Sequence, residues 1–171
     1  NALGQPTLVR EGSTTYANNV SFYPSGQARS FSYGNGVNFN QTLDEMQRPL
    51  DVVSAKGGQN RTAYSYRYDG NHNLSDIFDL TNSSKNIKLT YDNADRLKTA
   101  SGSWGAGDFN YDSAGNLLAK NLGTQRLSYD YDPVSKRLRS VSGGNNYLYD
   151  DRGNVTNNGF RNFQFNRANQ L

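Results

Sequence analysis

Apolar and polar residues alternate along short segments of the chain, and turn-forming residues separate these segments. The alternation is clearest in the tyrosine-rich stretch 64–68 and recurs at 109–111, 129–131, 147–149 and 163–165. A period of two places the aromatic side chains on one face of a β-strand. Glycine and asparagine are frequent throughout, and no apolar stripe with a helical period has useful length. The pattern therefore predicts an all-β chain of many short strands.

A seven-residue phrase follows most of these strands and gives the chain its repeat. It begins with Tyr-Asp, passes through a turn and ends on leucine or valine. Clear copies occupy residues 68–74, 91–97, 111–117 and 149–155, and a copy at 131–138 has one more residue in its turn. Weaker copies occupy residues 1–6, 22–28, 43–49 and 165–171. The spacing between copies varies, which suits hairpins joined by loops of different length better than a rigid solenoid.

Each position of the phrase has its own predicted role. The first residue lies on the aromatic face of the incoming strand. The aspartate at position two can accept hydrogen bonds from backbone N–H groups two or three residues further on. Position five tolerates the positive φ of a type I turn with a bulge, arginine or asparagine follows, and leucine opens the return strand. The predicted structural motif residues are Tyr68, Asp69, Tyr91, Asp92, Tyr111, Asp112, Gly115, Tyr131, Asp132, Tyr149, Asp150 and Gly153.

The chain offers little material for catalysis or metal binding. His72 is its one histidine, and it has no cysteine. A histidine can be a general base or a metal ligand, but His72 stands at position five of its turn, so we interpret it as an exposed turn residue with positive φ. A zinc site would need three carboxylates, and the aspartates recur once per hairpin instead of gathering in one loop as calcium sites require. We predict no catalytic residue, metal or cofactor, and no enzyme activity.

Trp104 is the best candidate for contact with a sugar. It lies in the glycine-rich segment 102–107, which we expect to be a flexible loop. An exposed indole can stack on a sugar ring, so a carbohydrate or cell-surface binding module that uses exposed aromatics is an alternative function. In the competing interpretation, the aromatic face covers neighbouring hairpins and Trp104 caps an edge of the sheet.

Charge and hydropathy exclude two classes of partner. The chain has 18 Lys and Arg against 15 Asp and Glu, a net charge of +3, and the basic residues are scattered. Without a basic stripe to neutralise a phosphate backbone, we expect no nucleic-acid partner. No apolar stretch approaches the roughly 20 residues that span a bilayer, so we also expect no membrane span.

The Tyr-Asp phrases, each followed by a turn rich in glycine or asparagine and then leucine or valine, resemble the YD repeats of the Rhs family. That family includes bacterial polymorphic toxins, the shell-forming components of Tc toxins, and the teneurins. The resemblance covers essentially the whole chain, most sharply 64–171. It implies tandem antiparallel β-hairpins in a strongly curved, spiralling sheet, the arc of a hollow shell. The Asp-Pro motif of family autoproteolysis is followed by glycine, whereas Asp132-Pro133 is followed by Val134; we interpret this segment as a turn.

The resemblance also implies a function. In the toxin members the shell holds a separate toxin domain, so we expect the wall of a shell that encapsulates a toxin or cargo polypeptide, secreted or at the cell surface of a bacterium. We expect residues 1–171 to form a single YD-repeat array, and the copies at both ends suggest a fragment of a longer repeat protein. The expected partners are the rest of its own shell and an enclosed polypeptide, with self-association through sheet edges.

Overall fold

The computed structural model describes residues 3–142 and 144–171, which form strands joined by turns. Helical structure within these residues is limited to one short 3-10 turn, η1 (Ser83–Lys85). The chain divides into two compact units, Asn1–Asp95 and Arg96–Leu171. The predicted all-β class with antiparallel hairpins is confirmed.

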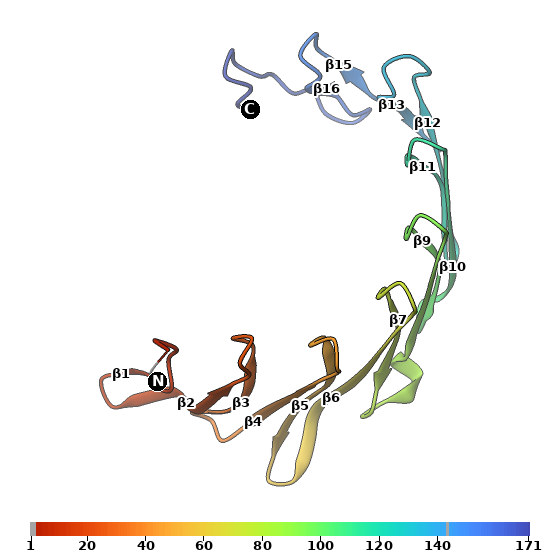
Figure 1. The fold of residues 1–171 in the computed structure, drawn as a ribbon. Helices are drawn as coiled ribbons and strands as arrows, with labels where there is room; N and C mark the ends of the chain where they lie inside the picture. The colour runs from red at the N-terminus through yellow and green to blue at the C-terminus, as the bar shows by residue number, and fades with distance from the viewer. Residues whose placement is uncertain (1–2, 143) are drawn as a thin grey trace. The chain divides into compact units, whose positions relative to one another are not determined.

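The first unit is an antiparallel meander in which each strand pairs with the next along the chain. Its strands are β1 (Val9–Glu11), β2 (Thr14–Phe22), β3 (Ala28–Tyr33), β4 (Asn38–Leu43), β5 (Pro49–Lys56), β6 (Gln59–Tyr68), β7 (Leu74–Asp79) and β8 (Ile87–Tyr91). The turns after β2, β4 and β6 belong to the repeated phrase and lie along one edge of this unit, and the turns after β1, β3 and β5 lie along the other (Figure 1).

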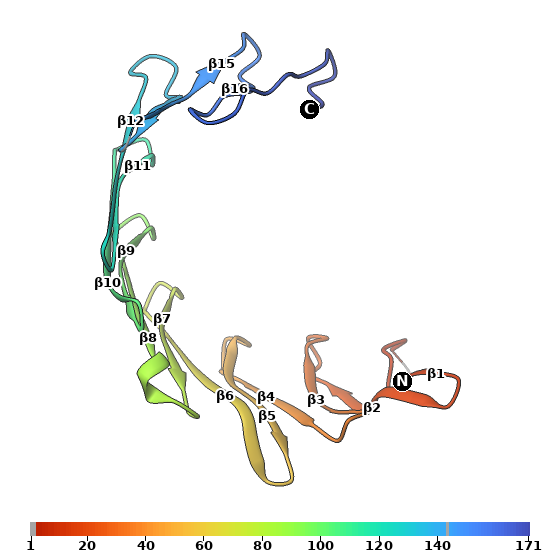
Figure 2. The same cartoon turned by 180° about the vertical axis from the view of Figure 1, so that it is seen from behind.

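The second unit repeats this architecture (Figure 2). Its strands are β9 (Leu97–Gly102), β10 (Gly105–Tyr111), β11 (Leu117–Leu122), β12 (Gln125–Tyr131), β13 (Leu138–Val141) and β14 (Asn145–Asn146). A separate antiparallel pair follows, β15 (Leu148–Tyr149) and β16 (Val155–Asn157). Return strands open on the leucine of the phrase at Leu74, Leu97, Leu117 and Leu138, as the sequence predicts.

The predicted strand at 163–165 is wrong. The backbone there makes one isolated bridge, between Asn157 and Asn162, and the Phe163 N–H donates to the Thr156 carbonyl at 2.8 Å. The Asn158 side chain accepts backbone hydrogen bonds from residues 160 and 161. Asparagine side chains that bind the local backbone compete with a strand ladder, and here they leave the ladder one bridge long.

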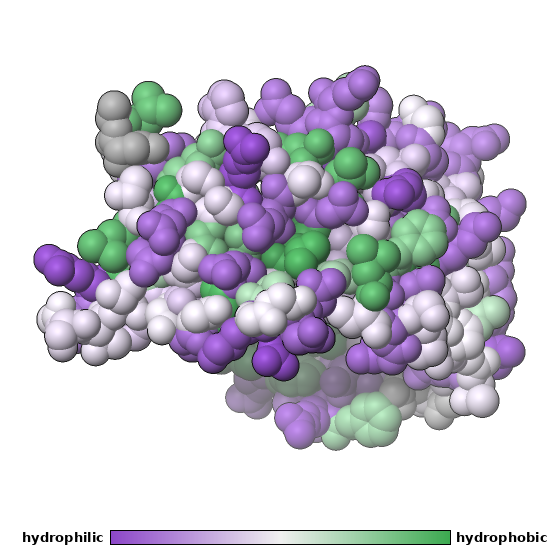
Figure 3. Space-filling model, turned by 90° about the horizontal axis from the view of Figure 1, so that it is seen from below, coloured by the Kyte–Doolittle hydropathy of each residue, from purple (hydrophilic) through white to green (hydrophobic). Residues whose placement is uncertain are grey.

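Very little of the sheet is buried. Among the described residues, the buried hydrophobic side chains are Ala63 and Ala100, and the buried polar ones are Ser65 and Asp79. The tyrosines of the phrase are half-buried, and on the face seen in Figure 3 hydrophobic residues lie in small groups among hydrophilic ones. Strand pairing and side-chain hydrogen bonds must therefore carry much of the stability that a core supplies elsewhere.

The repeat continues through both units. The boundary between them falls inside the copy at 91–97, after Asp95. That residues 1–171 form a single array stays a prediction.

Candidate functional site

The turn of each copy is built around the side chain at position two. In the copy at 111–117, Asp112 Oδ1 accepts hydrogen bonds from the N–H groups of Ala114 at 2.9 Å and Asn116 at 2.8 Å. Its Oδ2 accepts from the Asn116 amide nitrogen at 2.8 Å. The carboxylate therefore binds donors two and four residues further on, where the sequence predicts two or three. One aspartate thus satisfies the turn backbone and fixes the side chain at position six.

The same arrangement recurs along the chain. Paired backbone bonds to positions four and six are made by Asp44, Asp69, Asp150 and Asn166. Asp92 Oδ1 accepts from the Ala94 N–H at 2.9 Å. In the longer turn, Asp132 Oδ1 accepts from Val134 and Ser135 at 3.1 and 2.7 Å, which agrees with its interpretation as a turn residue. Position two is thus a turn residue in every one of these copies.

These bonds stabilise the charged carboxylate. The Asn116 side chain and backbone lower the pKa of Asp112, and the Asn154 side chain lowers that of Asp150. Desolvation raises the pKa of Asp44, but hydrogen bonds from the Arg48 backbone and side chain outweigh it, so this pKa too is lowered. Such carboxylates are held as anionic acceptors and are poorly suited to proton transfer near neutral pH.

Position five has positive φ in every copy, as predicted. The residues there are Gly4, Gly26, Gln47, His72, Asp95, Gly115, Lys136, Gly153 and Asn169. The N–H of this residue closes the turn on the carbonyl of position two, as from Gly115 to Asp112 at 3.1 Å. His72 has φ 70° and is exposed, so its interpretation as a turn residue is confirmed.

The tyrosine at position one joins successive hairpins. The hydroxyl of Tyr131 donates to the backbone carbonyl of Leu117, the last residue of the preceding copy, at 3.0 Å. Equivalent bonds run from Tyr68 to Pro49, Tyr91 to Leu74, Tyr111 to Leu97 and Tyr149 to Leu138, at 2.9 to 3.0 Å. We call this series the tyrosine ladder. It explains why tyrosine and not phenylalanine leads the clear copies.

Burial raises the pKa of four tyrosines of the ladder. Desolvation raises the pKa of Tyr68, Tyr91, Tyr131 and Tyr149. A neutral phenol keeps the proton that it donates, so the raised pKa extends the range in which the ladder hydroxyls can donate further into alkali. Sequence reasoning placed these rings on one face but missed the hydroxyl partner; the signal was the preference for tyrosine at position one.

Trp104 does not lie in a flexible loop. Ser103 and Trp104 are the two turn residues between β9 and β10, where Gly102 and Gly105 bring the strands together. The indole packs closely against Gly102, so that a Cβ atom added to this glycine would lie 2.7 Å from the ring. Trp104 remains 41% exposed. The tight turn fixes the indole at the edge opposite the repeated phrase.

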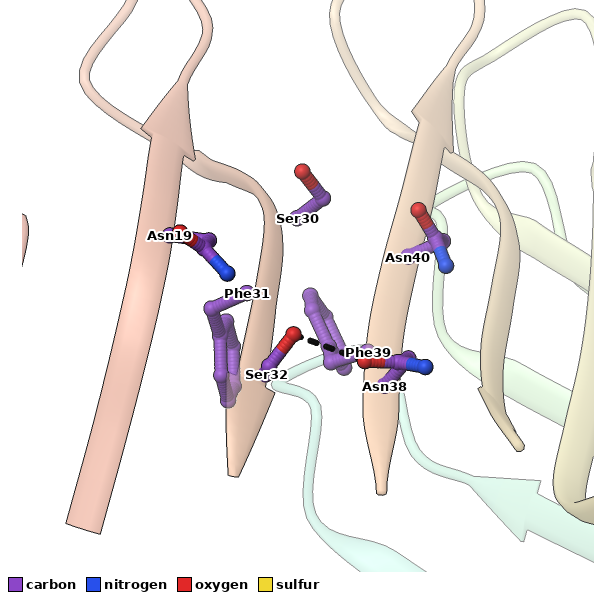
Figure 4. Close-up of a pocket in the computed structure, with 7 residues that line it drawn as sticks. All are labelled: Asn19, Ser30, Phe31, Ser32, Asn38, Phe39 and Asn40. Atoms are coloured by element: carbon purple, nitrogen blue, oxygen red, sulfur yellow. Dashed lines mark hydrogen bonds between the residues drawn. The ribbon is translucent and has the colours of Figure 1, made fainter. Parts of the chain in front are cut away.

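A shallow depression in the first unit is a further candidate for ligand contact. It has a volume of about 240 Å³ and lies between β2, β3 and β4 (Figure 4). Its lining residues are Asn19, Ser30, Phe31, Ser32, Asn38, Phe39 and Asn40. Ser32 donates to Asn38 Oδ1 at 2.7 Å, so part of the polar lining is already satisfied. Without a titratable side chain in its lining, the depression cannot supply acid–base chemistry.

The described residues offer no metal cluster. No three His, Asp or Glu side chains converge within residues 3–142 and 144–171. The His72 Nδ1 accepts a hydrogen bond from Arg48 Nη1 at 3.0 Å and is thereby engaged. No helix in the same residues has the length and apolar character to cross a membrane.

Comparison with known proteins yields a family and a fold. The sequence model described as Teneurin YD-shell matches residues 10–171. A Tc holotoxin pore of Photorhabdus luminescens shares 15% identity with the chain at a TM-score of 0.65, and a TcdB2-TccC3 structure without its hypervariable C-terminal region shares 15% at 0.66. Each likeness covers 84% of this chain and 10% of the solved one. No curated protein sequence matches significantly.

Proposed function

Because the chain belongs to the Teneurin YD-shell family, we propose that it forms a length of shell wall that encloses a toxin or other polypeptide cargo. The observation that carries this proposal is the tyrosine ladder, which joins hairpin to hairpin within each unit. Such a ladder makes a continuous hydrogen-bonded sheet from a repeated phrase. The likeness to a tenth of a solved Tc holotoxin chain supports the enclosing role.

The chemistry of the turns supports a structural role over an enzymatic one. The carboxylates of the phrase are bound by backbone and amide donors of their own turns, and the one histidine is held by an arginine. These groups stabilise the hairpins and are not free to bind a substrate. Membership of a shell family agrees with this assignment.

Enclosure is tested on the complete product of the gene. Limited proteolysis should leave an enclosed polypeptide intact at protease concentrations that digest the same polypeptide expressed alone. The digestion rate should rise once the shell is opened with a concentration of urea that disrupts the sheet. Equal digestion of the enclosed and the separate polypeptide would overturn the proposal.

We further propose that the protein is secreted or displayed at the cell surface of a bacterium, as the family resemblance implies. Fractionation of the native host, with an antibody against this chain, tests the location. Detection in the cytosolic fraction alone would contradict it.

Two contacts stand as subsidiary proposals. The exposed indole of Trp104 favours carbohydrate binding, which a glycan array tests with Trp104→Ala as the control. If the wild-type protein binds no glycan on the array, this function is excluded.

Strand edges favour self-association, and light scattering that shows a monomer at high protein concentration would exclude it.

A further inference from the structure

Position six of the repeated phrase has an unusual restriction. Every copy carries asparagine, glutamine or arginine there, namely Gln5, Gln27, Arg48, Asn73, Arg96, Asn116, Arg137, Asn154 and Gln170. These side chains share a planar end with at least two N–H donors. Lysine, serine, alanine and the acidic residues do not occur at this position. The chemistry in common is a flat group that can donate in two directions.

One of these donations stays within the turn. The side-chain amides of Asn116 and Asn154 donate to the position-two carboxylates of their own copies at 2.8 and 2.9 Å. Arg48 does the same through Nε, 2.8 Å from Asp44 Oδ2, and through Nη2 at 2.7 Å. This contact alone would need only one donor.

The second donation crosses to the next hairpin. The Asn73 amide also reaches Asp95 Oδ1 at 2.7 Å, and the Asn154 amide reaches Asn169 Oδ1 at 3.0 Å. Both acceptors stand at position five of the following copy. A single NH₂ group therefore binds its own turn with one hydrogen and the neighbouring turn with the other.

Arginine at position six also donates to the next copy, and its longer side chain reaches a backbone carbonyl there. Arg96 Nη1 donates to the Asp112 carbonyl at 2.9 Å, and Arg137 Nη1 donates to the Asp150 carbonyl at 3.3 Å. Each guanidinium also lies over the ladder tyrosine of the next copy, with distances to the ring centroid of 4.7 and 5.4 Å. Arg48 has the same position over its next tyrosine, at 4.1 Å, and such contacts are attractive.

At three junctions, position five of the following copy matches the position-six residue before it. Asparagine faces an oxygen acceptor, as with Asp95 and Asn169. Arg137 faces Gly153, where a Cβ would lie 3.2 Å from the guanidinium Nη2. Glycine at this position leaves room for the Arg137 side chain to contact the Tyr149 ring and the Asp150 carbonyl.

We propose that position six is a coupling residue, which transmits stability from one hairpin to the next wherever its side chain reaches the following copy. The proposal concerns assembly of the sheet and does not depend on what the sheet encloses. It predicts that loss of a coupling residue loosens two hairpins, whereas loss of a purely local turn contact loosens one.

The chain contains its own matched control. The Asn116 amide donates to Asp112, and within the described part of the chain it makes no bond to Lys136, which stands at the equivalent place in the next copy. Asn116→Ala therefore removes the local contact alone. Asn73→Ala removes the local contact, which is 3.3 Å long, together with its own crossing bond to Asp95. The bond that Asn71 donates to the same Asp95 oxygen at 3.0 Å remains.

Hydrogen exchange on the 171-residue chain separates the two roles, because local opening is measured segment by segment. Asn73→Ala should raise amide exchange both in its own turn and in the next turn at 92–95, by roughly two- to tenfold, as for one hydrogen bond. Asn116→Ala should raise exchange in its own hairpin only. Exchange confined to the mutated hairpin in both variants would overturn the proposal.

A double-mutant comparison gives an independent readout. Asp95→Gly and Lys136→Gly both keep a residue that tolerates their positive φ of 57° and 59°. The effects of Asn73→Ala and Asp95→Gly on the unfolding equilibrium should be non-additive, whereas those of Asn116→Ala and Lys136→Gly should add. Additivity in both pairs would contradict the coupling role. If Asn73→Ala does not fold, Asn154→Ala with Asn169→Gly makes the same comparison.

Discussion

The phenol hydroxyl of Tyr131 donates a hydrogen bond to the backbone carbonyl of Leu117, 3.0 Å away. Leu117 opens the return strand β11 of one hairpin, and Tyr131 ends the incoming strand β12 of the next. The bond therefore ties together the turn ends of two successive hairpins. The tyrosine ring supplies reach, and its hydroxyl supplies the donor.

Removal of the Tyr131 hydroxyl should destabilise the sheet by the free-energy contribution of one hydrogen bond. We expect Tyr131→Phe to lower the free energy of unfolding by about 0.5–1.5 kcal/mol, measured by urea denaturation. Tyr129→Phe is the matched control, since Tyr129 lies on the same face of β12 and its hydroxyl has no hydrogen-bond partner among the described residues. Equal losses in the two variants would show that the ladder bond contributes nothing specific.

Acid should destabilise the protein through the turn carboxylates. The pKa values of Asp112 and Asp150 are lowered by hydrogen bonds from Asn116 and Asn154. A lowered folded-state pKa contributes stability that is present above the unfolded value of about 3.9 and is lost as the pH falls through the folded value. The urea midpoint should therefore fall as the pH drops below about 4. Asp112→Asn should show a smaller fall than wild type; an unchanged acid dependence would refute the assignment.

Alkali should also destabilise the protein, through the tyrosine ladder, whose pKa values are raised where those of the turn carboxylates are lowered. Desolvation raises the pKa of Tyr91 and Tyr131. A raised folded-state pKa contributes stability that is complete below the unfolded value of about 10 and is lost as the pH rises through the folded value. Denaturation midpoints at increasing pH should decline above about 10, and the decline should be smaller in Tyr131→Phe. A variant that follows the wild-type curve would argue against ionisation of the ladder as the cause.

Two glycines give opposite expectations for the same substitution. A Cβ at Gly34 would lie 1.8 Å from the Thr15 carbonyl oxygen, because the Gly34 N–H donates to Tyr16 at 2.8 Å and holds the backbones together. Gly34→Ala should therefore cost about 1–3 kcal/mol through overpacking. Gly70 has open space around it, and Gly70→Ala should be neutral or stabilise by up to about 1 kcal/mol. Thermal denaturation of both variants checks the pair, and a tolerated Gly34→Ala would mean that the strands can separate there.

Local chemistry made the repeat predictable. Position five has positive φ, which glycine, asparagine and aspartate adopt at low cost, so the recurring turn is sufficient to predict that His72 is a turn residue. The aspartate at position two was likewise predictable as a turn acceptor. The position of the second backbone donor was predicted wrongly. It lies four residues after the aspartate and not three, because the bulge adds a residue that a simple turn lacks.

Contacts between hairpins could not be predicted in the same way. The alternation around Tyr131 gives the face on which its ring lies, but not that the hydroxyl reaches the carbonyl of Leu117. That partner depends on the register between adjacent strands. Trp104 shows the same limit, since its glycine-rich surroundings suggested a loop where strand pairing produced a two-residue turn. The strand predicted at 163–165 is absent for a different reason. Its residues alternate as in a strand, but nearby asparagine side chains bind their local backbone and compete with strand pairing.

The scarcity of buried side chains, with Ala63 and Ala100 as the buried hydrophobic residues of the described chain, has a calorimetric consequence. Exposure of apolar surface raises the heat capacity on unfolding and exposure of polar surface lowers it. A sheet that hides mostly backbone amides should therefore show a heat-capacity increment below the usual value of about 12–15 cal/mol/K per residue. Its stability curve should be correspondingly flat, so that its resistance to unfolding changes little between cold and warm conditions.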